Sequence, residues 1–332
     1  MSKPIGIIGA GSWGTALAII AARAGHDVTL WSRNADVVKS INEQRINSRY
    51  LTSESIPERV TATNEISVAL DRASLVLLAA PSHAVRALLT EMSAALDESA
   101  IIVSVSKGIE IETGKRISEI VKEVVGSSQA FVCLSGPSFA KEVVAGQPTA
   151  VVAASKDAAA ARAVQADLSF ENLRIYTNAD VVGTELGGSV KNVMAIAAGM
   201  TTGSGLGSNS VAALITRGLA EITRLARREG AQMETLMGLA GLGDLVLTCT
   251  GSLSRNRFVG EQLGKGIPLE EISAGMNEVA EGIKTTLAVQ QLAHRAGLEM
   301  PITNEVKAVL YDGKSVRDAV AELMSRPLRE ES

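Results

Sequence analysis

One lysine stands alone in a long uncharged stretch of this sequence. Between residues 186 and 216 the only charged side chain is that of Lys191. If the stretch is helical, the residues three and four positions away share the face of the lysine: Gly187, Gly188, Met194 and Ala195. The small residues on this face leave space above the ammonium and allow another backbone to approach. The resulting loss of water lowers the pKa of a lysine, which suits a proton donor or acceptor near neutral pH. The alternative is a lysine that extends into solvent from an amphipathic helix, but such a helix carries other charges nearby.

A glycine-rich turn near the N-terminus predicts a dinucleotide site. An apolar run over residues 5–8 leads to Gly9, Gly11 and Gly14, and an Ala- and Leu-rich segment of helical character follows. In such a strand–turn–helix, the first glycine allows the turn, the second lets the backbone approach the pyrophosphate and the third lets the helix pack against the strand. An ordinary strand-to-helix turn is the alternative, but both flanking patterns are those that the motif requires.

The residues after the second expected strand bear on the choice of cofactor. NAD-specific sheets carry an acidic residue there, which binds the ribose 2′-hydroxyl. This chain has Ser32 and Arg33 and no carboxylate. Arg33 could pair with a 2′-phosphate and Ser32 could donate a hydrogen bond to it, although a solvated loop arginine is the alternative. We therefore expect NADP(H) to be favoured, and the sequence leaves the use of NAD(H) open.

Several polar residues are suited to a small phosphorylated substrate. Lys107 lies just beyond the end of one expected strand, and residues 136–139 follow the next strand in the same way. Asp244 lies between glycines in an apolar segment, where a buried carboxylate needs a partner such as an active-site lysine. Residues 254–257 (SRNR) supply donors for a phosphate or carboxylate. Each feature alone could be a turn, a helix cap or a solvated basic pair, but together they favour a site.

None of the histidines fits the role of proton donor. His26 precedes the second expected strand, far from the carboxyl ends of the strands. His294 lies beside Arg295 in a helical segment and is expected at the surface. His83 follows a strand and could line a cleft, but no neighbouring carboxylate orients it.

The order of the elements predicts an α/β fold with a Rossmann-type, doubly wound and mostly parallel sheet. Apolar runs at residues 28–31, 74–80, 101–105, 130–134, 150–154 and 173–176 alternate with helical patterns, of which residues 157–168 are one. After residue 180 helical periodicity dominates. We therefore place a dinucleotide-binding domain at residues 1–180 and an all-helical substrate and catalytic domain at residues 181–332. Ligands are expected in the cleft at the carboxyl ends of the strands.

Composition excludes several classes of protein. A length of 332 residues suits two domains, and the net charge of −4 argues against nucleic acid as a partner. The sequence contains no run of eighteen apolar residues and no signal peptide, so we expect no membrane span. Cys133 and Cys249 lie far apart without a C-x-x-C motif, so we expect free thiols and a cytoplasmic location. We expect no metal ion.

With these residues assembled, the chain resembles the bacterial-type NAD(P)-dependent glycerol-3-phosphate dehydrogenases from end to end. The resemblance rests on residues 9–16 (GAGSWGTA), 104–110 (SVSKGIE), 134–140 (LSGPSFA), 187–193 (GGSVKNV), 241–245 (GLGDL) and 248–249 (TC), the last leading to 254–256 (SRN). Together and in this order they are far more specific than the glycine turn alone.

The resemblance implies a role for each of these residues. Lys191 would be the catalytic proton donor and acceptor. The substrate would be bound by Lys107, Gly136, Ser138, Lys191, Asp244, Ser254, Arg255 and Asn256. The cofactor would be bound by Ser12, Trp13, Arg33, Tyr50, Lys107, Ala140, Arg255, Val279 and Glu281, together with Gly9, Gly11 and Gly14 of the turn. Tyr50, Val279 and Glu281 rest on the local alignment alone. The resemblance also implies a homodimer.

The expected reaction is the reversible reduction of dihydroxyacetone phosphate to sn-glycerol 3-phosphate by NADPH or NADH, which supplies glycerophospholipid synthesis. Hydride transfer to C2 leaves an alkoxide that Lys191 would protonate. Asp244 would orient the lysines, and Arg255 with Asn256 would bind the phosphate. A hydroxyacid dehydrogenase of the 6-phosphogluconate type is one alternative, because that class also combines a Rossmann domain with a lysine on a helix. A catalytically silent NADP(H) sensor or scaffold is the other.

Overall fold

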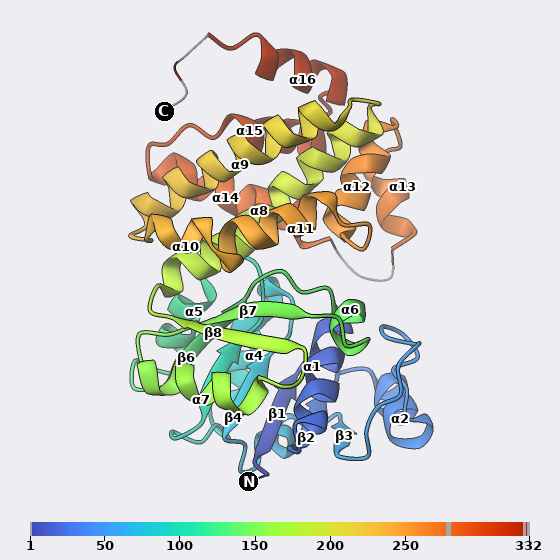
Figure 1. The fold of residues 1–332 in the computed structure, drawn as a ribbon, viewed down its shortest axis with the longest axis vertical. Helices are drawn as coiled ribbons and strands as arrows, with labels where there is room; N and C mark the ends of the chain where they lie inside the picture. The colour runs from blue at the N-terminus through green and yellow to red at the C-terminus, as the bar shows by residue number, and fades with distance from the viewer. Residues whose placement is uncertain (1, 277–279, 328–329, 331–332) are drawn as a thin grey trace. The chain divides into compact units, whose positions relative to one another are not determined.

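The computed structural model describes residues 2–276, 280–327 and 330 (Figure 1). The chain divides into two compact units. The sheet unit comprises Met1–Lys107 and Lys115–Glu185, and the helical unit comprises Gly108–Gly114 and Leu186–Ser332. The segment Gly108–Gly114 belongs to the helical unit, which its sequence did not indicate. The boundary near residue 180, as the limit of an independently folding domain, stays a prediction.

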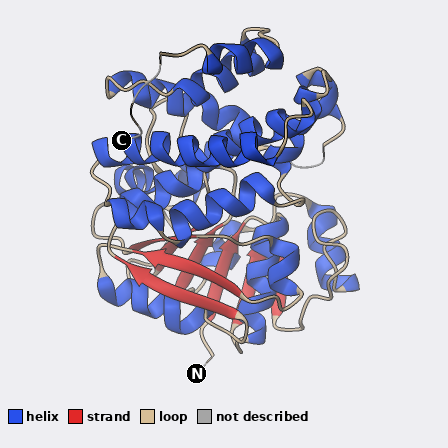
Figure 2. Ribbon diagram, turned by 45° about the horizontal axis from the view of Figure 1, so that its top comes forward, coloured by secondary structure: helices blue, strands red, loops and turns tan. Residues whose placement is uncertain are grey.

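The sheet unit is built on one eight-stranded sheet (Figure 2), in the order β3-β2-β1-β4-β5-β6-β7-β8. Its strands are β1 (Pro4–Ile8), β2 (Asp27–Trp31), β3 (Val60–Thr63), β4 (Leu75–Leu78), β5 (Ile101–Ser104), β6 (Phe131–Ser135), β7 (Thr149–Ala154) and β8 (Leu173–Asn178). Neighbouring strands are parallel except for β6 and β7. The predicted doubly wound and mostly parallel sheet is confirmed.

Two hydrophobic cores cover the two faces of this sheet. Successive side chains of a strand point to opposite faces, so Leu77 belongs to one core and its neighbour Leu78 to the other. The helices of the unit are α1 (Ser12–Arg23), α2 (Ala35–Gln44), α3 (Ile66–Leu70), α4 (Val85–Met92), α5 (Ile117–Val124), α6 (Ala140–Val144) and α7 (Ala158–Leu168), with a 3-10 turn η1 at Ser82–Ala84. Because both faces are covered, β4 is buried throughout and shows no alternation in its sequence.

Strand β3 was not expected from the sequence. Its four residues pair with β2 from Val28 opposite Val60 to Trp31 opposite Thr63. From α2, the Asn42 side chain donates to the Ala62 carbonyl at 2.9 Å and accepts from the Ala62 amide at 2.8 Å. A strand this short depends on these partners from elsewhere in the chain, so its own residues give little signal.

The helical unit contains no strand among its described residues, which confirms the predicted all-helical second half. Its helices are α8 (Val181–Gly203, which begins in the sheet unit), α9 (Ser208–Arg228), α10 (Met233–Met237), the π-helical turn η2 (Leu239–Gly243), α11 (Asp244–Thr250), α12 (Arg255–Gly264), α13 (Leu269–Ala274), α14 (Glu281–Arg295), α15 (Pro301–Tyr311) and α16 (Val316–Met324). In the part of the chain that the structure describes, no helix combines the length and apolar character that crossing a membrane requires.

Helices α8 and α12 approach each other with their backbones in contact. A Cβ atom on Gly199 of α8 would lie 2.0 Å from the Arg257 carbonyl oxygen. A Cβ atom on Gly260 of α12 would lie 1.9 Å from the Ile196 carbonyl oxygen. Glycine is therefore required on both helices, and this contact fixes the start of α12 beside the helix that carries Lys191.

Candidate active site

Lys191 lies on α8 inside the helical unit and is 5% exposed. Its Nζ donates a hydrogen bond to Oδ1 of Asp244 and another, of 2.8 Å, to Oγ1 of Thr248. Asp244 is 1% exposed, so an ammonium and a carboxylate are buried together. The lysine does not extend into solvent as it would on an ordinary amphipathic helix.

The glycines around these residues let the two segments meet. A Cβ atom on Gly187 would lie 2.6 Å from the Ala240 carbonyl oxygen, so the backbone of η2 lies directly against α8. Asp244 begins α11 immediately after η2, and this contact brings its carboxylate to Lys191. Thr248 follows one turn later, and its hydroxyl donates to the Asp244 carbonyl oxygen at 2.6 Å. The expected approach of a second backbone to the face of Lys191 is thus seen.

Burial and the carboxylate act on the ammonium in opposite directions. Removal from water disfavours the charged form of a lysine, whereas a carboxylate in hydrogen-bonding contact favours it. The neighbouring Cys249 is subject to the same fields. Its burial, assisted by Asp244 and opposed by Lys191, raises the pKa of the thiol to about 12. Cys249 is therefore a neutral thiol at physiological pH.

The predicted phosphate donors lie at the start of α12. Ser254 caps this helix by accepting a hydrogen bond from the Arg257 amide at 3.2 Å. Asn256 is buried, and its Nδ2 donates to Oδ1 of Asn192 at 3.0 Å. Its Oδ1 accepts from the amide of Gly282 at 2.9 Å.

Arg255 differs from its two neighbours because its side chain reaches the surface. The surrounding protein still removes part of the water from the guanidinium, which lowers the pKa of Arg255, and the Glu281 carboxylate opposes this shift. Glu281 begins α14, so two residues that the sequence assigned to the cofactor influence each other electrostatically. Val279, assigned to the same role, lies outside the described residues.

In the sheet unit the glycine-rich turn has the geometry that a dinucleotide needs. Gly9 has a φ of +121°, and a Cβ there would lie 2.6 Å from the Ala79 carbonyl oxygen. A Cβ on Gly14 would lie 1.9 Å from the Gly9 carbonyl oxygen, so α1 packs closely on the turn. Around Gly11, by contrast, no described atom lies within 4 Å of where a Cβ would be. This open space in front of the N-terminus of α1 fits a pyrophosphate.

The other predicted cofactor residues of the sheet unit surround this turn or lie at strand ends. Ser12 donates to the Tyr50 carbonyl oxygen at 3.0 Å, and the Trp13 and Tyr50 rings are partly buried against the sheet core. Arg33 is exposed just after β2. Ser32 is buried, and its hydroxyl oxygen accepts from the Asn34 amide at 3.2 Å.

Lys107, Gly136 and Ser138 converge on a single carbonyl group. Lys107 follows β5, and its Nζ donates to the Gly136 carbonyl oxygen at 3.0 Å. The Ser138 hydroxyl donates to the same oxygen at 3.0 Å. Ala140 begins α6 two residues later. The structure thus brings together Lys107 with residues 136–140 in one unit, and Lys191 with Asp244 in the other.

Two polar residues of the Lys191 surroundings received no role from the sequence. Thr248 bonds to Lys191 and Asn192 bonds to Asn256. The available signal was spacing, because Thr248 lies one helical turn after Asp244 and Asn192 is adjacent to Lys191.

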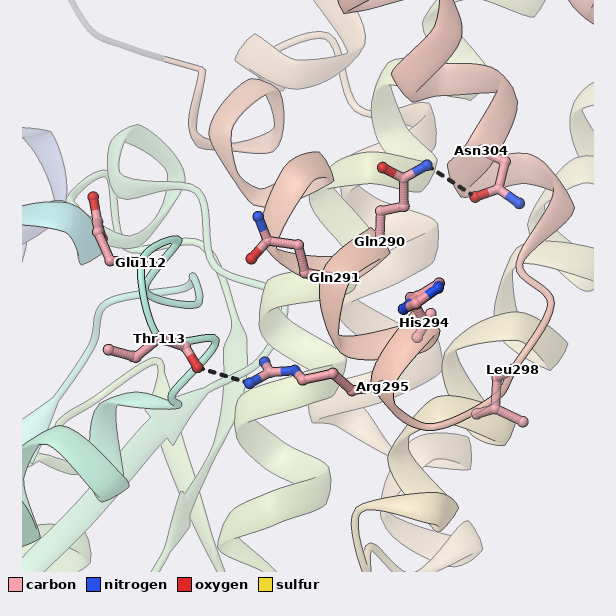
Figure 3. A pocket seen from close by; sticks show the side chains of 9 residues that line it. Glu112, Thr113, Gln290, Gln291, His294, Arg295, Leu298 and Asn304 are labelled. Carbon is pink, nitrogen blue, oxygen red and sulfur yellow. Dashed lines mark hydrogen bonds between the residues drawn. The ribbon is translucent and has the colours of Figure 1, made fainter.

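The three histidines lie on other segments of the chain than these residues. His26 is buried before β2, where Nδ1 accepts from the Lys3 amide at 3.3 Å and Nε2 lies 3.0 Å from the Asp167 carbonyl oxygen. His83 is exposed in η1. His294 is exposed on α14, as expected, and lines a pocket of about 680 Å³ (Figure 3).

This pocket lies within the helical unit and contains none of the predicted site residues. Its lining comes from residues 112–113, α14, the turn after it and α15. Arg295 donates to the Thr113 carbonyl oxygen at 3.0 Å and thereby ties the segment after Lys107 to α14 (Figure 3).

A glycine-rich turn of this geometry on a doubly wound sheet is typical of NAD(P)-dependent dehydrogenases. Two family descriptions match this chain: the NAD-dependent glycerol-3-phosphate dehydrogenase N-terminus over residues 4–161 and the corresponding C-terminus over residues 180–321. The chain belongs to this family, which confirms the resemblance seen in the sequence.

Individual relatives agree with this assignment. The chain is 55% identical to the glycerol-3-phosphate dehydrogenase (NAD(P)+) of Koribacter versatilis over 97% of each chain. It is 51% identical to the enzyme of the same name from Citrifermentans bemidjiense, over 100% of this chain and 99% of that one. The crystal structure of glycerol-3-phosphate dehydrogenase from Coxiella burnetii is similar with a TM-score of 0.95 and 41% identity, over 98% of this chain and 99% of that one.

Proposed function

We propose that this protein is a glycerol-3-phosphate dehydrogenase, which reduces dihydroxyacetone phosphate to sn-glycerol 3-phosphate with a reduced nicotinamide dinucleotide, reversibly. The observation that carries the proposal is the buried Lys191, held by Asp244 and Thr248 in the unit without the dinucleotide turn. A structural lysine gains little from burial with one carboxylate, since the loss of hydration opposes the pairing. A proton donor needs such a fixed and water-poor position.

One residue of the chain donates the proton, and two others hold that residue in position. The nicotinamide, when bound, supplies a hydride to C2 of the substrate. The Lys191 ammonium gives a proton to the oxygen on C2 as negative charge develops there, so that the carbonyl becomes a secondary alcohol. Asp244 and Thr248 fix the position of Nζ through the hydrogen bonds that they make with it.

Other residues position the substrate through its phosphate, away from the reacting carbon. We assign this to Arg255 and Asn256 with Ser254, and to Lys107 with Gly136 and Ser138. Arg255 offers a forked set of donors that suits a phosphate, and Asn256 is fixed by its bonds to Asn192 and Gly282. Binding at the phosphate orients C2 for the transfer.

For the cofactor we propose NADP(H) in preference to NAD(H). The support is the exposed guanidinium of Arg33 after β2, where NAD-specific sheets have a carboxylate. Gly9, Gly11 and Gly14 with Ser12 and Trp13 would bind the pyrophosphate, and Tyr50, Lys107, Ala140, Arg255 and Glu281 would contact the rest of the dinucleotide.

We also propose a homodimer in the cytoplasm that supplies glycerophospholipid synthesis. Both cysteines, Cys133 and Cys249, are buried free thiols, which suits a reducing compartment.

Nicotinamide absorbance tests the proposed function. The protein is mixed with NADPH or NADH and, in separate reactions, with dihydroxyacetone phosphate or with the oxidised substrate of a 6-phosphogluconate-type dehydrogenase. Oxidation with dihydroxyacetone phosphate alone, faster with NADPH, is the expected result. Turnover of the other substrate would favour the hydroxyacid class, and cofactor binding without turnover of any ketone would favour a silent sensor.

A further inference from the structure

The fully buried side chain of Asn47 holds the glycine-rich turn. Asn47 follows α2 and is 0% exposed. Its Nδ2 donates to the Ala10 carbonyl oxygen at 2.9 Å and to Oγ1 of Thr15 at 2.7 Å. Ala10 lies between Gly9 and Gly11, so one end of this carboxamide binds the turn itself.

The other end of the carboxamide organises the segment 47–51. Oδ1 accepts from the amides of Arg49 at 3.3 Å and Tyr50 at 3.2 Å. The backbone closes on itself, because the Leu51 amide donates to the Asn47 carbonyl oxygen at 3.3 Å. Asn47 therefore joins two segments that are far apart in the sequence.

A carboxamide is suited to this junction. The Ala10 carbonyl needs a donor, whereas the amides of Arg49 and Tyr50 need an acceptor. An asparagine supplies both from one short side chain, whereas a carboxylate supplies only acceptors. The Ala10 carbonyl also accepts from Oγ1 of Thr15, at 3.4 Å, so Asn47 and Thr15 hold the turn together.

The segment that Asn47 holds presents two side chains beside the turn. Ser12, the first residue of α1, donates to the Tyr50 carbonyl oxygen and makes a second link between segment and turn. The Arg49 guanidinium carbon lies 5.4 Å from the centre of the Tyr50 ring. A cation and an aromatic ring next to a phosphate-binding turn suit the adenosine and pyrophosphate part of a dinucleotide.

We propose that Asn47 is a positioning residue for dinucleotide binding. Asn47 holds the glycine-rich turn and the side chains of Arg49 and Tyr50 at the spacing that the phosphorylated half of the dinucleotide requires. The inference rests on the proposed function, since it assumes that the turn binds a nicotinamide dinucleotide. Asn47 lies in the sheet unit, whereas Lys191 lies in the helical unit. Its loss therefore affects cofactor binding and leaves the chemical step largely intact.

Asn42 provides a matched control in the same unit. It also donates to a backbone carbonyl and accepts from a backbone amide, both of Ala62, and it joins α2 to β3. Asn42→Ala and Asn47→Ala thus each remove a carboxamide that ties two segments together. Only Asn47→Ala releases the glycine-rich turn.

The test measures the Kd for NADPH by direct titration of nicotinamide fluorescence, with Tm, KM and kcat measured in parallel. For Asn47→Ala we expect Kd and the KM for NADPH to rise by at least about tenfold, or about 1.4 kcal/mol, with kcat within about threefold of wild type. Asn42→Ala should lower Tm without moving Kd. Asn47→Asp keeps the acceptor for Arg49 and Tyr50 but loses the donor to Ala10, and it provides the same readout if the alanine variant does not fold.

A Kd for both Asn47 variants within twofold of wild type, or an equal rise in Asn42→Ala, would overturn the positioning role. Failure of the proposed function gives a different result. Wild-type protein would then bind NADPH without reducing dihydroxyacetone phosphate, and the comparison of Kd values would still test the role of Asn47. Wild-type protein that binds neither NADPH nor NADH would overturn both.

Discussion

Two of the buried carboxylates of the helical unit, Asp244 and Glu221, have opposite surroundings. Asp244 faces the ammonium of Lys191 and the hydroxyl of Thr248. Glu221 of α9 accepts hydrogen bonds from the amides of Ile302 and Thr303 at the start of α15, at 2.7 and 3.4 Å.

The difference indicates that Asp244 belongs to an active site, whereas Glu221 is a structural helix cap. Glu221 satisfies backbone amides that the first turn of a helix leaves without a partner, so its role is complete within the fold. Asp244 instead holds a second charged group whose burial the fold does not need. We therefore expect changes at the Lys191–Asp244 pair to alter turnover and changes at Glu221 to alter stability.

The largest effect is expected for Lys191→Ala. Removal of the proton donor should lower kcat by about a thousandfold, within the usual range for general acid catalysis. The Kd for NADPH should change little, because the dinucleotide turn lies in the other unit. Steady-state kinetics with direct NADPH titration checks both values, and near-normal kcat in a folded protein would refute the assignment.

Asp244→Asn should lower kcat by about a hundredfold. The amide keeps the shape of the side chain but no longer stabilises or orients the ammonium through charge. The pH profile of kcat is the informative measurement, and it should shift relative to wild type. An unchanged profile with only a lower Tm would make Asp244 a structural partner of Lys191.

Thr248→Val should have a smaller effect, a loss in kcat of about tenfold, because only the hydrogen bond from Nζ to an uncharged hydroxyl is lost while the shape is retained. The measurement is the same kinetic assay, with Thr250→Val as its control. Thr250 lies on the same helix and donates to the Val246 carbonyl oxygen, but it is exposed. Equal losses in the two variants would show that the hydroxyl of Thr248 has no special role.

Glu221→Gln should leave kcat and KM unchanged and alter the pH dependence of stability. Burial raises the pKa of Glu221 to about 7 from 4.5, although Arg224 and the amides of Ile302 and Thr303 oppose the shift. The folded state thus holds the proton more tightly than the unfolded state. The stabilisation is fully present below about pH 4.5 and is lost as the pH rises through about 7, by an amount on the order of 3 kcal/mol.

Denaturant unfolding at several pH values measures how the free energy of unfolding changes with pH. The glutamine variant should lack the Glu221 contribution between about pH 4.5 and 7, whereas wild type should lose stability over that interval. If the variant instead lost turnover while its free energy of unfolding kept the wild-type dependence on pH, the distinction between Glu221 and Asp244 would be wrong.

Much of the site was predictable because its signals are local. The glycine turn needs glycine at fixed spacings, and each of Gly9, Gly11 and Gly14 shows the space or close approach that the motif implies. Lys191 was conspicuous because no other charged residue lies between residues 186 and 216. Such features depend on neighbours along the chain.

The features that were missed depend on distant partners. Strand β3 exists through its pairing with β2 and through Asn42. The segment Gly108–Gly114 joins the helical unit, in which Arg295 binds the Thr113 carbonyl. Asn47 looks like an ordinary loop residue until its two ends are seen to bind the glycine turn and the 47–51 segment. No local pattern records such contacts.

Chemical rescue of Lys191→Ala tests the central claim most directly. The rate of NADPH oxidation by dihydroxyacetone phosphate is measured across a series of small ammonium ions of different pKa, with wild type as the control. If the buried ammonium is the proton donor, the variant's rate rises with the concentration and acidity of the added ion, while wild type does not respond. A rate that stays flat across the whole series, or one already equal to wild type without any added ion, would contradict the account.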